Sequence, residues 1–255
     1  MKELSESQKT FLLVFVAFLL GIVTGPLIPA LMLECIYTPY PNILGPFLMF
    51  FAWLCILSSF KKDNRWFYVP LAIFLIFTLV APFLGMTEVI PKVKERIAHP
   101  PSQGLIGVKP YSFTTFITIF THNSGGSITD YLSGVSIILP FLAEAIWDLY
   151  FSTMTAAFIS YWHWKGLKVI LGSIFIYFEY SASYLSFIAG ANVSRYMFKA
   201  IIDVLRTRRI RGNFKEVKEA FKWGLKLVGV SIVLFFVAAI FETWWAPWWY
   251  KQIFP

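Results

Sequence analysis

Long apolar runs separated by short polar segments dominate the chain. A helix that crosses a bilayer needs about 20 mostly apolar residues, and runs of that kind recur along the whole sequence. The pattern predicts an all-α, polytopic transmembrane helical bundle of about seven spans (range six to eight), with interfacial amphipathic helices. The expected spans are 10–35, 44–60, 66–89, 127–143, 146–162, 169–197 and 225–241.

Polar segments mark the connections between these spans. The sequence KKDNR at 61–65 predicts a tight turn, and the stretch 91–110, rich in proline and charge, is the longest polar loop. The run 111–120 is too short to cross a membrane, so we expect it to be interfacial or re-entrant. The expected organisation is a three-span segment at 1–90, a loop at 91–112, a four-span core at 113–247 and an aromatic tail at 248–255.

The apolar run from 128 to 164 is long enough for two spans. Pro140, Glu144 and Asp148 interrupt it, and we place the break between the two spans there. The sequence HWKGLK at 163–168 then predicts a short connection to the next span.

An amphipathic pattern precedes the last span. Between 213 and 228, apolar residues recur on one face at helical spacing while lysines take the other face. This predicts a surface helix in the headgroup region. Asn213, followed three residues later by Glu216, resembles a capping box at its start.

Composition supports a membrane protein. The chain is 58% hydrophobic and only 14% charged, whereas a soluble domain usually carries about 25% charged residues. The expected surroundings are therefore a lipid bilayer, with the protein passing through the cell membrane several times.

The net charge of +8 is concentrated in one connection. Nine basic residues stand against three acidic ones between Lys199 and Lys226. A basic run can bind nucleic acid, but flanking spans favour the positive-inside rule, and we expect no nucleic-acid partner. The N-terminus and the Lys199–Lys226 connection are expected to be cytoplasmic, and the C-terminus outside.

No motif for a cofactor, a metal or catalysis appears. The two cysteines and three histidines match no metal-ligand spacing, and no G-x-S-x-G, P-loop or H-E-x-x-H sequence is present. We therefore expect no metal site, no cofactor and no enzymatic activity.

Three acidic residues lie within or beside the expected spans. A carboxyl group inside a bilayer is costly, which makes it a functional hypothesis by default. Glu144 and Glu242 fall at span ends, where interfacial water can solvate them. Glu179 lies about ten residues inside its span and is the strongest candidate.

Small residues share the helical face of Glu179. At helical spacing, Ser183, Ser186 and Gly190 follow it as a narrow stripe. A stripe of this kind permits close approach of a second helix. Two interpretations remain open, namely a packing seam, in which Glu179 is neutral or bonded across the bundle, and a proton or substrate site.

Other polar and small residues complete the candidate set. Asn192 and Arg195 lie near the cytoplasmic end of the same span, where an arginine can reach the interface. Asn123 is expected to cap a helix or turn. Gly21 and Gly25 form a G-x-x-x-G sequence, and the prolines after it predict a bend as much as a packing face.

Several segments resemble a known family in their order along the chain. FTTFITIFTHN, STMTAAFIS, FEYSASYLSFIAGANVSRY and AAIFETWWAP are similar to segments of the stage II sporulation protein M family of integral membrane proteins. The resemblance covers about 111–247. The residues that match the family's pattern are Asn123, Glu179 with Ala189 and Gly190, and Glu242 with Pro247.

The chain also departs from that pattern. Family members often carry Pro-His-Gly just before the glutamate within the span, and here residues 174–176 read Ile-Phe-Ile. The asparagine-glycine often found in the second core span is missing near 152–160. Because the Pro-His-Gly sequence is absent here, no role of the family's histidine carries over to this chain.

Two functions are consistent with these patterns. The resemblance implies a non-enzymatic scaffold or assembly factor that recruits envelope or membrane-remodelling partners. The small-residue faces indicate a homodimer or an assembly with other membrane proteins. The alternative is a transporter or channel-like protein that uses Glu179 as a proton or substrate site. The chain shows no inverted repeat, which is a feature of many transporters.

Overall fold

The computed structural model describes residues 5–31, 41–84, 110–208 and 214–254, and these residues form helices with no strand among them. The all-α prediction is confirmed for this part of the chain. A π-helical turn, Phe241–Trp245, separates the last two helices. The helices are α1 (Glu6–Thr24), α2 (Leu27–Leu31), α3 (Pro41–Leu57), α4 (Arg65–Leu84), α6 (Phe113–Ser133), α7 (Leu139–Trp162), α8 (Trp164–Gly172), α9 (Ile174–Thr207), α10 (Lys215–Ile240) and α11 (Ala246–Ile253).

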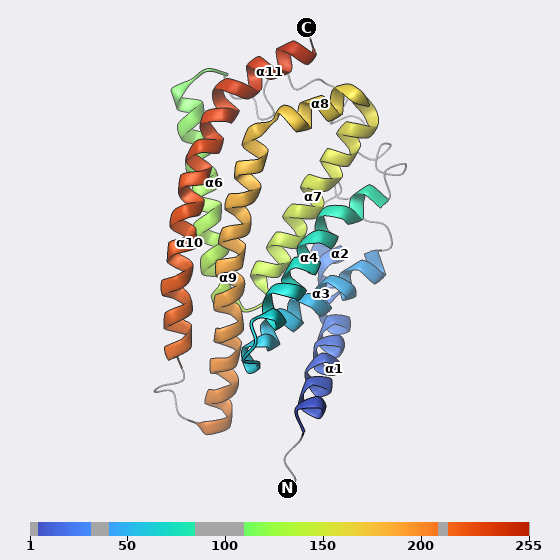
Figure 1. The fold of residues 1–255 in the computed structure, drawn as a ribbon, viewed down its shortest axis with the longest axis vertical. Helices are drawn as coiled ribbons and strands as arrows, with labels where there is room; N and C mark the ends of the chain where they lie inside the picture. The colour runs from blue at the N-terminus through green and yellow to red at the C-terminus, as the bar shows by residue number, and fades with distance from the viewer. Residues whose placement is uncertain (1–4, 32–40, 85–109, 209–213, 255) are drawn as a thin grey trace.

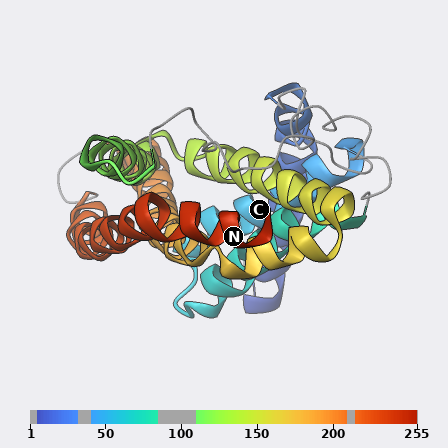
Figure 2. The ribbon, with the colours of Figure 1, turned by 90° about the horizontal axis from the view of Figure 1, so that it is seen from above.

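The long helices form an elongated bundle (Figure 1). Helices α6, α9 and α10 pack side by side, and α1, α3, α4 and α7 form the other flank. Short helices α8 and α11 lie across one end, where Figure 2 shows them from above. The start of α1, the turn before α4 and the two ends of the α9–α10 connection lie toward the opposite end.

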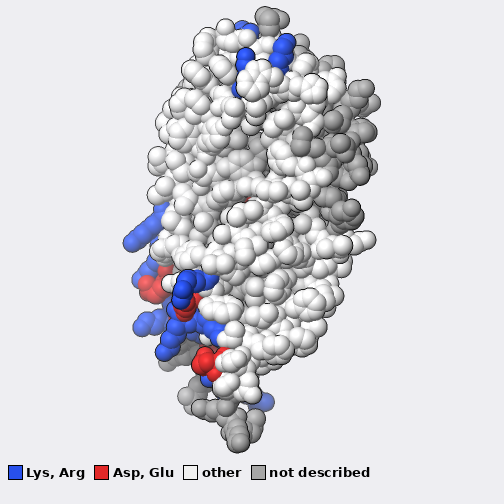
Figure 3. All heavy atoms as spheres, turned by 45° about the vertical axis from the view of Figure 1, so that its right-hand side comes forward, with Lys and Arg blue, Asp and Glu red and all other residues white. Residues whose placement is uncertain are grey.

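Four described segments are long and apolar enough to cross a membrane, namely Glu6–Leu31, Asn42–Phe60, Arg65–Leu84 and Lys215–Ile253. A fifth is α8 together with α9, which are bent by 60° at the break between them. The prediction of a polytopic membrane protein is supported, whereas seven spans remain a prediction because α6 and α7 do not meet the same test. Charged side chains gather toward the ends of the face in Figure 3, with a broad uncharged surface between them.

One hydrophobic core joins the N-terminal helices to the rest of the bundle. Phe74 of α4, Phe141 of α7 and Phe187 of α9 meet with ring centroids 5.4–5.8 Å apart. All three side chains are fully or almost fully buried. The expected three-span segment therefore shares its core with the segment that follows it.

Gly21 and Gly25 are a packing face within the chain. A Cβ added at Gly25 would lie 2.4 Å from the Pro46 nitrogen, and one at Gly21 would lie 2.8 Å from the Phe50 nitrogen. Only glycine permits α1 to approach the α3 backbone this closely. The face is thus occupied by α3 and is not available for a homodimer.

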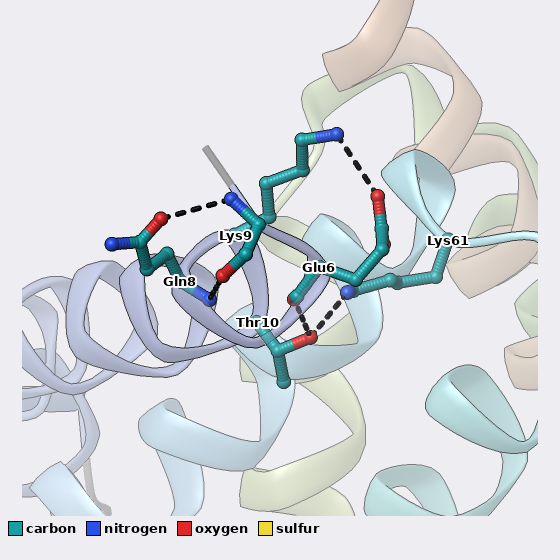
Figure 4. Close-up of polar contacts among 6 residues, drawn as sticks. Glu6, Gln8, Lys9, Thr10 and Lys61 are labelled. Atoms are coloured by element: carbon teal, nitrogen blue, oxygen red, sulfur yellow. Dashed lines mark hydrogen bonds and ion pairs between the residues drawn. The ribbon is translucent and has the colours of Figure 1, made fainter. Parts of the chain in front are cut away.

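The start of α1 is fixed to the turn that precedes α4 (Figure 4). Ser5 and Gln8 form a capping box. The Lys61 ammonium donates to the Thr10 hydroxyl at 2.6 Å, and Lys9 pairs with Glu6. These contacts hold the basic turn 61–65 beside the start of α1.

The predicted span at 127–143 is wrong. Residues 111–120, expected to be interfacial, mostly belong to the first half of α6, which continues to Ser133. A 3-10 turn at Gly134–Ser136 and the positive φ of Ile137 break the helix there. Pro140 lies in the first turn of α7, where proline favours helix initiation, so α7 contains the expected 146–162 span.

The ends of the last three predicted segments also differ. Residues 164–172 form helix α8 instead of a simple connection, and α9 extends to Thr207. The expected surface helix at 213–228 is the first half of α10, continuous with the last span; Asn213 lies outside the described residues. The expected tail at 248–255 falls mostly within α11.

Candidate functional site

The small-residue stripe of α9 is a seam with α6 and α10. Ser186, Ser127 and Ser231 bond to one another from these three helices, with Ser231 2.9 Å from each of the other two hydroxyl oxygens. All three are buried. A Cβ added at Gly190 would lie 2.5 Å from the Asp130 carbonyl oxygen of α6, while Ser183 is half-buried. The packing interpretation therefore holds for this part of the stripe.

Glu179 faces a polar partner instead. The Asn123 side-chain amide donates to Glu179 Oε1 at 2.5 Å, joining α6 to α9. Asn123 lies inside α6 and caps no helix, so its expected capping role is wrong. The Asn123 amide instead positions the Glu179 carboxyl group of α9 by a hydrogen bond.

Glu242 lies beside Glu179, within reach of a side-chain hydrogen bond. Glu242 belongs to the π-helical turn, and such turns often occur at functional sites because the extra residue redirects side chains. Neither glutamate is in an ion pair with a Lys or Arg of the described residues. Two carboxyl groups this close are stable when they share a proton.

Pro247 explains why the helix widens at this point. A proline has no backbone N–H, so it cannot donate to the carbonyl four residues earlier, at Thr243. The Thr243 carbonyl instead accepts from the Tyr111 N–H at 3.2 Å, and Ala246 donates to Phe241 five residues back. The Glu-x-x-x-x-Pro spacing thus places Glu242 on the widened turn. Tyr111, with its positive φ, was not identified from sequence.

Two tryptophans attach this turn to the bend between α8 and α9. Trp245 Nε1 donates to the Gly172 carbonyl at 2.9 Å, and Trp249 Nε1 donates to the Lys168 carbonyl at 3.1 Å. Trp244 and Trp248 are exposed. The aromatic cluster therefore both faces outward and fixes the end of α8.

Glu144 does not reach interfacial water as expected. It lies within α7, where it is 3% exposed, and Asp148 on the next turn of that helix is 0% exposed. The Thr78 hydroxyl of α4 donates to Asp148 Oδ2 at 2.8 Å. The expected break between two spans separates Glu144 from Asp148, so the sequence pattern does not identify them as a pair. On an unbroken helix, their four-residue spacing places both on one face, and this is the signal that identifies the pair.

Arg195 is buried and does not extend to the interface as expected. Its guanidinium carbon lies 4.4 Å from the centroid of the Phe67 ring, and Nη2 donates to the Tyr196 hydroxyl at 2.9 Å. Longer contacts of 3.5 Å reach Ser58 and Asn64. Arg195 thus connects α9 to the turn between α3 and α4. Asn192, one turn earlier, is also buried.

The part of the chain that the structure describes shows an open hollow near Glu242 but no cluster suited to a metal. The described residues contain no group of three or more His, Cys, Asp or Glu side chains arranged to hold a metal ion. An open hollow of about 350 Å³ is lined by Ile240, Phe241, Trp244, Trp245 and Trp248. These side chains are apolar or aromatic, and they come from the widened turn and the residues next to it, without contributing a charge.

The family model for stage II sporulation protein M matches residues 70–247. The chain belongs to the stage II sporulation protein M family. The matched region begins in α4, earlier than the motifs indicate, and it contains Asn123, Glu179, Glu242 and the Glu144–Asp148 pair. The search of curated proteins and the search of solved structures each found no match.

Proposed function

We propose that this member of the stage II sporulation protein M family is a non-enzymatic transporter or channel-like protein of the cell membrane. In this proposal the Glu179–Glu242 pair binds and transfers a proton. The observation that carries it is the meeting of two carboxyl groups and the Asn123 amide at the junction of α6, α9 and the π-helical turn.

The location of the pair favours transfer over packing alone. Acidic side chains inside a membrane are retained where they form proton relays or ion paths. Both glutamates lie next to interrupted helices, since α9 begins after a 60° bend and α10 ends in a π-helical turn. Interrupted helices surround the binding sites of many secondary transporters.

The charge distribution supports an orientation for this proposal. The basic turn 61–65, the end of α9 and the start of α10 lie toward one end of the bundle (Figure 1). The positive-inside rule assigns that end to the cytoplasm. If the seven helices of 17 residues or more all cross, the N-terminus is cytoplasmic and the C-terminus is outside.

A flux assay tests the proposal. The purified protein is reconstituted into liposomes that contain a pH-sensitive dye, and an imposed proton gradient is followed with a range of solutes outside. We expect the wild-type protein to give a higher proton flux than empty liposomes. We expect Glu179→Gln to lower the flux to that of empty liposomes. Glu219→Gln, which alters an exposed acid of α10, is the matched control and should retain flux. Equal flux in wild type and Glu179→Gln would contradict the proposal.

The outward face of α6 favours a second candidate, a scaffold that binds a partner helix. Gly125 and Gly126 are exposed, and an added Cβ at either would meet nothing within 4 Å. His122 is exposed on the same helix. Small and polar residues on a membrane helix are typical of helix–helix contacts, and either a second copy of the chain or another membrane protein is a suitable partner.

Substitution on this face separates the two candidates. Gly125→Leu should leave the monomer folded, because the described residues leave room for the new side chain. A scaffold that uses α6 would lose its dimer or partner in detergent and in membranes. If Gly125→Leu keeps both its oligomeric state and the membrane proteins that co-purify with the wild type, this face is ruled out.

A further inference from the structure

A second pair of carboxyl groups lies in the bundle, away from Glu179. Glu144 and Asp148 are four residues apart on α7, a spacing that places both on one face of the helix. Their exposed fractions are 3% and 0%. Neither is in an ion pair with a described Lys or Arg.

Several oxygen atoms in this region have no hydrogen-bonding partner. Asp148 Oδ2 accepts from Thr78, but Asp148 Oδ1 and Glu144 Oε1 receive no donor from the protein. The Tyr184 hydroxyl lies beside Asp148 as a possible donor but completes no hydrogen bond, and nothing comparable in the described residues faces Glu144 Oε1. Unpaired buried polar groups are rare and costly, and carboxylate oxygens only accept. The missing component is therefore a donor or a cation.

The groups that surround the pair add negative charge or hydroxyls. Asp130 of α6 interacts electrostatically with Glu144, and Tyr180 and Tyr184 of α9 interact with both carboxyl groups. From α4 the polar contact is Thr78, while α2 and the described part of α3 contain no charged residue. The lysines of α8 lie over the rings of Phe254 and Trp164.

Ser152 makes the region rigid. Its hydroxyl donates to the Asp148 carbonyl at 2.6 Å and approaches the Thr78 carbonyl at 3.2 Å, which ties α7 to α4. The acceptor oxygens are therefore held in place by two helices. Buried acidic groups on helices that are fixed to each other in this way suit a small cation.

We propose that Glu144 and Asp148 form a second site, which binds one monovalent cation, a proton or Na⁺, between their unpaired oxygens. A positive charge there would satisfy both acceptors and offset the charge of the pair. Tyr180 interacts electrostatically with Asp148, Glu144 and Glu179, so it is near both pairs. A role for this site in transport rests on the proposed function; cation binding does not.

Two measurements on the full-length protein in detergent test the site. The first is the unfolding temperature during a titration with NaCl, with choline chloride replacing NaCl at constant ionic strength. The second is infrared spectroscopy of the C=O band of protonated carboxyl groups as a function of pH. The variants are Glu144→Gln and Asp148→Asn, and Glu179→Gln is the matched control from the first pair.

The two cations give different positive results. If the ion is Na⁺, sodium raises the unfolding temperature of wild type and Glu179→Gln, and this shift is lost in Glu144→Gln and Asp148→Asn. If it is a proton, sodium has no effect, and one pH-dependent carboxyl band is lost in both α7 variants but kept in Glu179→Gln. Absence of both the sodium shift and such a band would overturn the proposal, whatever the outcome of the flux assay.

Discussion

The two acid pairs contain the same chemical groups, but they are built in different ways. Glu179 and Glu242 come from separate segments, and an amide from a third helix bonds one of them. Glu144 and Asp148 come from consecutive turns of α7, and each retains an oxygen with no protein donor. The first pair therefore depends on how the helices pack, whereas the second depends on one helix and on what binds to it.

This difference predicts opposite effects on stability. Removing one member of a bonded set leaves its partners unpaired, which costs about 1–3 kcal/mol when they are buried and less when, like Asn123 and Glu242, they are half-buried. Replacing a buried charge that has no protein partner by an apolar side chain of similar size is often neutral or stabilising. The first pair should therefore stabilise the fold, and the second should reduce its stability when no cation is bound.

Glu179→Leu is expected to have the largest effect on stability. It removes the acceptor of the half-buried Asn123 amide and the neighbour of Glu242, so the free energy of unfolding should fall by about 2 kcal/mol. Thermal or denaturant unfolding in detergent measures this change. Glu219→Leu, at an exposed position of α10, is the control and should change stability little. Equal effects of the two substitutions would show that the Asn123–Glu179 bond is not stabilising.

Pro247→Ala should disturb only the first pair. Alanine restores an N–H that competes with Tyr111 for the Thr243 carbonyl, so the widened turn should relax toward an ordinary α-helix. The change in stability should be about 1 kcal/mol or less, the net value of one hydrogen bond. Glu242 should move away from Glu179 and proton flux should fall. Retention of full flux would mean that the turn does not position Glu242.

Glu144→Met is the corresponding test of the second pair. In sodium-free buffer at neutral pH, removing an acceptor that lacks a donor should leave the free energy of unfolding unchanged or raise it by about 1 kcal/mol. The same unfolding assay measures it. A loss of 2 kcal/mol or more would show that Glu144 has a stabilising protein partner, and the contrast between the pairs would disappear.

Arg195→Lys provides a reference point away from both pairs. The contacts of Arg195 with the Phe67 and Tyr196 rings depend on a flat guanidinium, which lysine lacks. Because Arg195 is buried, the free energy of unfolding should fall by about 1–2 kcal/mol, with no change in flux. Loss of flux in this variant would show that general loosening of the bundle, and not chemistry at Glu179, reduces transport.

Local spacing made part of the site predictable from sequence. The stripe of Ser186 and Gly190 follows helical periodicity, and its packing role needed no knowledge of the partner helix. Glu179 was identified because a carboxyl group in an apolar run is unusual. Its partner Asn123, 56 positions earlier in the chain, could be found as a candidate but not as a partner, because the contact depends on tertiary packing.

The second pair was missed for a different reason. Pro140 and the acids after it predict a helix break, so Glu144 falls at the end of one expected span and Asp148 near the start of the next. The actual break is at 134–138, where glycine, serine and Ile137 with its positive φ end α6. Proline in the first turn of a helix and proline that ends a helix differ only in position, and the sequence pattern does not distinguish them.

The central claim is that Glu179 and Glu242 act as one proton-transfer unit. A double-mutant cycle of proton flux in liposomes tests it most directly, with wild type, Glu179→Gln, Glu242→Gln and the double variant. Residues that act as a unit are strongly non-additive. We predict that each single variant loses the flux and that the double variant is no worse than either one. Independent, additive losses, or flux retained in either single variant, would contradict the claim.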